Sequence, residues 1–309
     1  MRTARTKTTA TIRSLAAGCL ALLFLLASCE GGATEALRSV PASSAAGGGT
    51  ASYLALGDSL AVGYQPGRGE TAKGYVDDLW RSIRQQIPGL SLRNVGCAGE
   101  TSRSMITGKH SLCRYAAGSQ LDAAVRFLER HPDEVSFITI DIGANDVVGR
   151  CLDFDTGLID QGCVVDLLPR LNTRITGILD ALRAAAGPGV PIVGMTYYVP
   201  FLGFWGLVPG GHRLARADLR AFEVLNDGLA ATYEVAGATV ADVAGTFRID
   251  DFTQTVVVED RGRLPVNVTR ACRWTWFCSE RHFGDPHANR KGYARIAHTF
   301  NRVLQTLLP

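Results

Sequence analysis

The sequence predicts an α/β protein in which helices cover both faces of a parallel β-sheet, giving three layers. Two observations carry this prediction. Short apolar runs alternate along the chain with segments whose apolar residues recur at helical spacing. The runs are almost continuously apolar, so both faces of each strand are expected to be buried, as in parallel sheets.

The first half of the chain supplies three predicted strands and two predicted helices. Residues 53–56 and 90–95 form the first two apolar runs. Residues 135–142 are strongly β-branched, which favours a third strand. Over 75–83 and 121–128, apolar residues recur every three or four positions, as on the buried face of a helix. Each helix is therefore expected to return the chain for the next parallel strand.

The same alternation continues in the second half, with three helices and two strands. In chain order, these elements are expected over residues 168–182, 190–199, 219–233, 239–243 and 296–307. Residues 250–278 break the alternation and predict an irregular or hairpin insertion. Since no repeat or further boundary is visible, residues 51–309 are expected to form one domain with a substantial core.

The first 28 residues have the form of a signal peptide. A basic start precedes an apolar run over 15–26 that is too short to span a bilayer stably. Leu26-Ala27-Ser28-Cys29 resembles a bacterial lipobox, which makes Cys29 the expected lipidation site. Ordinary cleavage nearby, releasing a free secreted protein, is the alternative. Residues 29–50 are rich in Gly, Ser and Ala and predict a flexible tether to the membrane.

The formal net charge of +3 belongs to this N-terminal segment. Residues 1–28 hold 4 of the 32 basic residues and no acidic residue, so residues 29–309 hold 28 basic against 29 acidic residues. Such a balance does not favour nucleic acid or another polyanion as a partner. We expect a monomer that acts on a small-molecule or lipid substrate.

Six of the eight cysteines remain once Cys19 is cleaved away and Cys29 is acylated. An exported chain meets an oxidising compartment, so three disulfides are expected. Locality in the sequence favours the pairs Cys97–Cys113, Cys151–Cys163 and Cys272–Cys278, although six cysteines allow other pairings. Zinc binding is the alternative, but no C-x-x-C pair or nearby His couplet supports it, and no metal is expected.

Four polar segments lie just beyond predicted strand ends or beside the last helix, where open α/β sheets place their ligands. They are Gly57-Asp58-Ser59-Leu60 and the segments 94–101, 141–146 and 284–293. A serine between a buried strand and the following helix can expose its hydroxyl, and Gly57 permits the tight backbone this needs. Alone, the Gly-Asp-Ser triplet is a weak signal, because these residues are common in turns and helix caps.

Together and in this order, the four segments resemble those of the SGNH (GDSL) hydrolase family, from about residue 51 to the C-terminus. The resemblance implies a flavodoxin-like sheet of order 2-1-3-4-5 and a serine esterase or lipase that needs no metal or cofactor. It implies that Ser59 is the nucleophile and His287 the general base. The implied oxyanion donors are the backbone N–H groups of Ser59 and Gly99 and the side-chain amide of Asn145. Since strands one and three are neighbours in this order, Ser59 and Asn145 are expected at one crevice.

The group that orients His287 stays open. Family members usually carry Asp three residues before the histidine, but that position is Gly284 here. The favoured candidate is Asp285, which would reach the ring through a locally altered turn. The other candidates are a backbone carbonyl and Glu280. His287 itself is preferred to His282 because H-x-N-x-x-G-Y follows it and leads into the last helix.

Several polar residues near these segments are expected to be structural. Asp58 and Asp146 suit turns or caps, and Asn94 and Asn289 suit structural roles. The remaining histidines have no motif around them and are expected at the surface or hydrogen-bonded: His110, His131, His212 and His298. The unusually apolar segment 201–208 is expected to line or cover an acyl pocket, which favours a hydrophobic acyl group. Buried core packing is the alternative for this segment.

The sequence therefore predicts an extracytoplasmic, lipid-anchored esterase or lipase-like enzyme. Removal of O-acetyl groups from cell-wall or other carbohydrates is the alternative activity. From another class, a non-catalytic surface lipoprotein could use the same fold to bind a ligand. Such a protein would be expected to have lost Ser59, Asn145 or His287, and all three are present.

Overall fold

The structure is a computed structural model that describes residues 51–259 and 261–308. The predicted signal peptide (1–28), the tether (29–50) and the lipidation site Cys29 lie outside the described residues. Among the helices that are described, none is long and apolar enough to cross a membrane.

The centre of the fold is a sheet of five parallel strands in the order β2-β1-β3-β6-β7. Their bounds are β1 Ser52–Gly57, β2 Ser91–Asn94, β3 Val135–Asp141, β6 Ile192–Met195 and β7 Thr239–Ala241. The predicted order 2-1-3-4-5 is confirmed. β1 and β3 stay in register up to Gly57 opposite Asp141, so the chain leaves both strands at one edge of the sheet.

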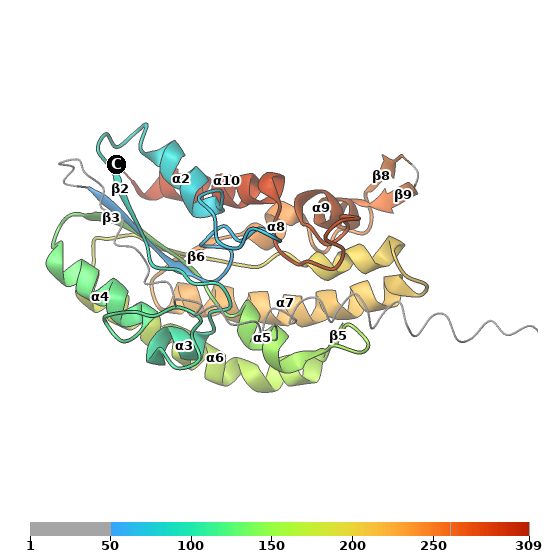
Figure 1. Ribbon diagram of the computed structural model, residues 1–309, viewed down its shortest axis with the longest axis horizontal. Helices are drawn as coiled ribbons and strands as arrows, with labels where there is room; N and C mark the ends of the chain where they lie inside the picture. The colour runs from blue at the N-terminus through green and yellow to red at the C-terminus, as the bar shows by residue number, and fades with distance from the viewer. Residues whose placement is uncertain (1–50, 260, 309) are drawn as a thin grey trace, which may run out of the picture.

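Helices cover both faces of the sheet, which confirms the three layers (Figure 1). On one side, α2 (Tyr75–Ile83) packs against α10 (Arg290–Leu307). On the other lie α4 (Gln120–Arg130), α6 (Gln161–Ala186) and α7 (Gly211–Val235). α4, α6 and α7 are each longer than the apolar stripe that predicted them, because the stripe marks only the part of a helix that contacts the sheet.

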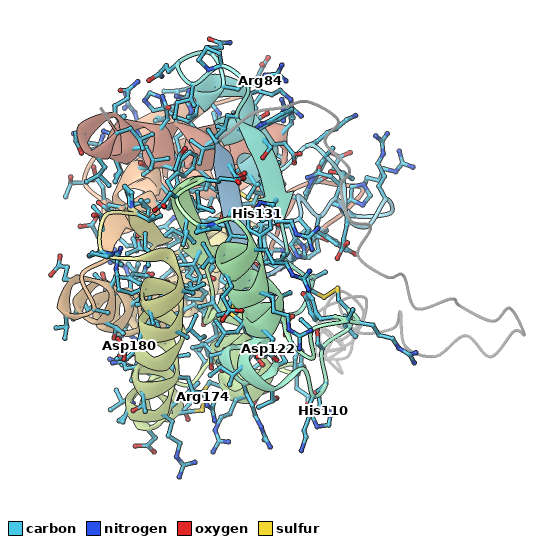
Figure 2. The ribbon with its side chains drawn as sticks, turned by 90° about the vertical axis from the view of Figure 1, so that its left-hand side faces the viewer. Arg84, His110, Asp122, His131, Arg174 and Asp180 are labelled. Atoms are coloured by element: carbon cyan, nitrogen blue, oxygen red, sulfur yellow. A yellow bond between two sulfur atoms is a disulfide. The ribbon has the colours of Figure 1, made fainter. Side chains whose placement is uncertain are left out.

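Figure 2 shows the molecule from the left-hand side of Figure 1, with Arg174 and Asp180 on α6 and His131 at the end of α4. His131 Nδ1 is 3.1 Å from Glu134 Oε2, and its ring lies 4.5 Å from that of Phe127. This histidine is thus a hydrogen-bonded surface residue, as expected from the sequence.

The core is centred on β1 and β3, whose large side chains are fully buried. The rings of Tyr53 and Phe137 stack at 4.4 Å between centroids. Neighbouring Leu54, Ile138 and Ile140 are also without exposure. Burying a side chain of this size stabilises the fold by about 1.5–3 kcal/mol, so these strands form a firm platform for the residues that follow them.

The fourth strand is shorter than predicted. β6 ends at Met195, not at residue 199, because the backbone of Tyr197 pairs with a side chain instead of a strand. Tyr197 N donates to Asn226 Oδ1 at 2.7 Å, and Asn226 Nδ2 donates to Tyr197 O at 2.8 Å. The chain then continues into the 3₁₀ helix η3 (Pro200–Gly206).

The predicted insertion contains both a hairpin and a helix. β8 (Thr255–Val258) pairs with β9 (Gly262–Pro265) and is followed by α9 (Val266–Trp274), which was not predicted. Other short elements also escaped prediction, because they have too few residues to show a period. They are α3 Ser102–Thr107, α5 Ala144–Cys151, β4 Leu152–Asp153, β5 Leu158–Ile159 and α8 Val243–Phe247.

Three disulfides join the pairs favoured by locality: Cys97–Cys113, Cys151–Cys163 and Cys272–Cys278. The chain-entropy account assigns roughly 2–3 kcal/mol to closing loops of this size. The first bridge lies in the segment after β2, and the second lies beside the β4–β5 hairpin. Both therefore stabilise loops at the edge of the sheet where Ser59 and Asn145 lie.

Asp218 of α7 attaches the β4–β5 hairpin to the second helical layer. Its side chain is fully buried, and Oδ1 accepts a hydrogen bond from Ile159 N at 2.8 Å. Among the described residues, Oδ2 has no hydrogen-bond partner. Burial without a cation raises the pKa of Asp218 to about 7.

A raised acid pKa means that ionisation of Asp218 destabilises the folded state. The loss of folding stability begins as the pH rises above the pKa of Asp218 in the unfolded chain, near 4. It is complete above about pH 7. We expect Asp218→Asn to match the wild-type melting temperature within about 2 °C at pH 4 and to exceed it by roughly 3–6 °C at pH 8. Differential scanning calorimetry of both proteins across this range is the test. A difference in melting temperature between the two proteins that is the same at every pH would contradict this expectation.

Candidate active site

Ser59 lies on the turn that leaves β1. Gly57, the last residue of the strand, has φ +152°, and a Cβ there would lie 2.3 Å from Asp141 Oδ1. Only glycine fits this close approach. Asp58 N donates to Asp141 Oδ2 at 3.1 Å, and Leu60 N donates to Asp58 Oδ1 at 2.9 Å. The backbone on both sides of Ser59 is therefore fixed.

A continuous line of hydrogen bonds joins Ser59 to a carboxylate. Ser59 Oγ is 3.0 Å from His287 Nε2, and His287 Nδ1 is 2.9 Å from Asp285 Oδ1. The same oxygen accepts the backbone N–H of His287 at 2.9 Å. Of the candidates for orienting His287, the structure brings Asp285 to the ring and leaves Glu280 exposed. Gly284 has φ +85°, a turn that lets a carboxylate two residues before the histidine reach it.

The ring of His287 is also held from the side. Tyr64 lies against it, with 4.4 Å between centroids, and Trp276 N donates to His287 O at 2.9 Å. His282, the rejected alternative, lies against the ring of Trp276. Sequence reasoning missed Tyr64, because no spacing in the sequence connects it with His287.

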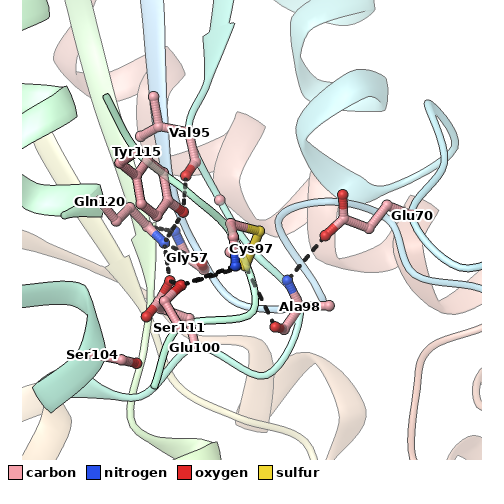
Figure 3. Close-up of a disulfide and its surroundings, with 12 residues drawn as sticks. Gly57, Glu70, Val95, Cys97, Ala98, Glu100, Ser104, Ser111, Tyr115 and Gln120 are labelled. Atoms are coloured by element: carbon pink, nitrogen blue, oxygen red, sulfur yellow. Dashed lines mark hydrogen bonds between the residues drawn. A yellow bond between two sulfur atoms is a disulfide. The ribbon is translucent and has the colours of Figure 1, made fainter. Parts of the chain in front are cut away.

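Gly99 lies in a loop that side chains attach to β1, and Figure 3 labels its neighbours Ala98 and Glu100. Gln120 of α4 accepts Gly57 N at 2.7 Å and donates to both Gly57 O and Glu100 Oε2 at 3.1 Å. Ser111 Oγ donates to the same Glu100 oxygen at 2.9 Å. Burial raises the pKa of Glu100, because it disfavours the charged carboxylate. The hydrogen bonds from Gln120 and Ser111 offset part of this cost. Gln120 thus couples the position of Gly99 to the end of β1.

Asn145 follows β3 in the first turn of α5. Its Nδ2 donates to Glu100 O at 2.9 Å, which uses one of its two amide hydrogens. Asn145, Gly99, Ser59 and His287 all line the same pocket. The structure therefore brings together every residue that the resemblance implied for catalysis.

That pocket has a volume of about 470 Å³ and is mainly apolar. Its apolar walls come from segments far apart in the sequence and include Leu112, Val148, Phe154, Phe201 and Phe222. The predicted contribution of segment 201–208 is thus limited to its beginning, since Phe204 packs on Phe277 in the core at 4.9 Å. A cavity of this size and polarity accommodates a hydrocarbon chain.

Two buried carboxyls lie beneath Ser59. Burial and the neighbouring Asp58 raise the pKa of Asp141 well above its ordinary value, and burial raises that of Asp58. Tyr75 OH donates to Asp141 Oδ1, and Tyr197 OH donates to Asp58 Oδ2 at 3.2 Å. Because Asp58 and Asp141 interact, their two carboxyls do not ionise independently.

The other polar residues singled out in the sequence have structural roles. Asp146 accepts Ser102 N at 2.7 Å and Ser102 Oγ at 2.6 Å, which fixes the start of α3. Asn289 caps α10 by accepting Lys291 N at 2.9 Å. Asn94 Nδ2 donates to a backbone carbonyl, that of Ala61, at 2.8 Å.

The sheet order, the serine at the end of β1 and the apolar pocket beside it fit a hydrolase that acts on esters. The chain belongs to the GDSL-like lipase/acylhydrolase family, whose sequence profile matches residues 55–295. The resemblance to SGNH hydrolases is thereby confirmed. No curated protein matches the sequence significantly.

Solved structures show the same fold. An extracellular lipase from Streptomyces rimosus is 17% identical, with a TM-score of 0.53, over 83% of this chain and 99% of that chain. A putative GDSL-like lipase from Parabacteroides merdae is 14% identical, with a TM-score of 0.51, over 83% and 96% of the two chains. At such low identities the likeness extends to the fold alone.

Proposed function

We propose that the protein is a serine esterase that forms an acyl-enzyme on Ser59. The observation that carries this proposal is the hydrogen-bonded line from Ser59 Oγ through His287 to Asp285, at the wall of an apolar pocket. A nucleophile, a base within hydrogen-bond reach and a carboxylate that orients the base are the components that acyl transfer requires.

In the proposed reaction, Ser59 Oγ attacks the ester carbonyl carbon while His287 Nε2 takes the hydroxyl proton. The carbonyl oxygen becomes an oxyanion, which the N–H groups of Ser59 and Gly99 and the Asn145 amide would stabilise. Return of the electron pair expels the alkoxide, which receives the proton from His287. Water then attacks the acyl-enzyme in the same way and releases the carboxylic acid, restoring Ser59.

The pocket favours a hydrophobic acyl group over an acetyl group. Each buried methylene adds about 0.8 kcal/mol, or roughly fourfold in binding, until the pocket is full. We expect kcat/KM for p-nitrophenyl esters to rise by at least tenfold from acetyl to octanoyl. Turnover across an ester panel tests this expectation. Faster hydrolysis of acetylated glycans than of the medium-chain esters would instead support the deacetylase.

Val148→Trp tests the same pocket by filling it. Val148 lies one turn after Asn145 on α5 and lines the cavity. The larger ring should lower kcat/KM for the octanoyl ester by roughly tenfold or more and leave the acetyl ester within about threefold. Val165→Trp is the matched control, because Val165 is half exposed on α6 and does not line the pocket. Equal losses for both esters would argue against an acyl pocket here.

We also propose that the protein is exported and held at the membrane by a lipid on Cys29. Three disulfides support an oxidising location, and the Leu26–Cys29 segment supports lipidation. In cells that produce the full chain, the protein should partition into detergent-extractable membranes. Cys29→Ala should move it to the soluble or unprocessed fraction. Membrane partitioning of a variant that has lost residues 1–28 would refute the anchor.

A further inference from the structure

A second pocket lies between α8, α9 and α10 and has a volume of about 580 Å³. We call it the basic pocket. Four arginines line it together with a histidine and an indole ring: Arg248, Arg270, Arg295, Arg302, His298 and Trp274. The excess of positive charge is local, because residues 29–309 as a whole hold nearly equal numbers of basic and acidic residues.

Three of the four arginines lack a carboxylate partner among the described residues, although Arg270 donates to Thr246 O at 2.6 Å. Arg248 pairs with Asp251, but within residues 51–259 and 261–308 no carboxylate lies within 4.0 Å of Arg270, Arg295 or Arg302. Asp242 is the acidic residue of the lining. Its Oδ1 is already engaged, since it accepts Gly245 N at 2.8 Å as the N-cap of α8.

The fold holds these cations together in spite of their repulsion. Arg270 and Arg295, from different helices, both lie against Trp274, at 5.1 and 5.3 Å from the ring centroid. Partial burial, followed by the charges of Arg248 and Arg295, lowers the pKa of Arg270. An anion placed between the guanidinium groups would remove this repulsion and gain charge-assisted hydrogen bonds.

We propose that the basic pocket binds a phosphate group. One guanidinium fork is enough to satisfy a carboxylate, whereas a tetrahedral phosphate has oxygens for several forks that come from different elements. The pocket is larger than one phosphate, so it has room for the organic part of a phosphate ester. Inorganic phosphate is the smallest ligand that tests this chemistry.

A row of three aromatic rings connects the basic pocket with the active-site pocket. Tyr198, which lines the active-site pocket, stacks on Phe247 at 4.6 Å, and Phe247 meets Trp274 edge-on at 5.0 Å. The rings of Tyr198, Phe247 and Trp274 would therefore separate a phosphate-bearing molecule or surface held by the arginines from the catalytic pocket. The site is nevertheless separate, since no residue lines both pockets.

The test is calorimetric titration of inorganic phosphate into the purified protein at low ionic strength. We expect saturable binding that Arg295→Gln/Arg302→Gln weakens by roughly tenfold or more. The matched control is Arg273→Gln/Lys291→Gln, which removes the same charge from α9 and α10 at exposed residues outside the pocket. The control should stay within about twofold of wild type. No saturable binding, or equal weakening in both double variants, would overturn the proposal.

Vesicles distinguish the two sources of the phosphate group. Binding to phosphatidylglycerol vesicles but not to phosphatidylcholine vesicles, lost in Arg295→Gln/Arg302→Gln, would identify a lipid headgroup. Phosphate binding without vesicle binding would identify a soluble phosphate ester. Ser59→Ala should bind phosphate as wild type does, so the outcome is independent of the proposed esterase reaction.

Discussion

Ser59→Ala is expected to lower kcat/KM for a medium-chain p-nitrophenyl ester by about 10⁴-fold or more. Without Oγ no acyl-enzyme forms, and only transition-state stabilisation by the remaining donors is left. The substitution removes one atom from a side chain that is 9% exposed, so folding should be little affected. Steady-state kinetics, with the melting temperature as a check on folding, measure the effect.

A fluorophosphonate probe gives a second readout of the same change. Wild type should gain the mass of one phosphonyl group, mapped to the peptide that contains Ser59, and Ser59→Ala should gain none. Ser279→Ala is the matched control, because Ser279 does not line the active-site pocket. Labelling of Ser59→Ala at the wild-type rate would place the nucleophile elsewhere.

Asp285→Asn is expected to have the second largest effect, a loss of roughly 10³–10⁴-fold in kcat/KM. Asp285 Oδ1 accepts a hydrogen bond from the backbone N–H of His287 and lies 2.9 Å from Nδ1 of its ring. An amide can turn its NH₂ toward Nδ1 and stabilise the tautomer that protonates Nε2, which then cannot accept the proton of Ser59. Kinetics across an ester panel measure the loss.

The control for this variant is Glu280→Gln, which removes a carboxylate of the same loop that is exposed to solvent. It should retain activity within about twofold. If Asp285→Asn turned over esters at a near-wild-type rate, a backbone carbonyl would have to orient His287 instead. The pair of variants therefore decides between the alternatives that the sequence left open.

The sheet and the residues that follow its strands could be predicted because both depend on local signals. Apolar runs mark the strands, and the parallel order brings the ends of β1 and β3 together, which places Ser59 and Asn145 at one edge. As the group that orients His287, Asp285 could be favoured from the sequence but not established. This role depends on the positive φ of Gly284, which a sequence permits but does not require.

Contacts between segments far apart in the chain could not be predicted. Tyr64 against His287, and Gln120 between Gly57 and Glu100, depend on how loops meet in space. The basic pocket was hidden for the same reason. Its arginines come from positions between 248 and 302, and a nearly balanced total charge conceals their convergence. Net charge therefore excluded a basic surface overall but not a basic site.

The Cys97–Cys113 bridge has a consequence for when the enzyme becomes active. It closes the loop that carries Gly99, one of the proposed oxyanion donors, and it lies beside the Glu100–Ser111 contact. A newly made chain in a reducing cytoplasm would lack this constraint, so its donors would not yet be pre-organised. Under the proposed export, oxidation outside the cytoplasm would then act as a maturation step that completes the constraint on these donors.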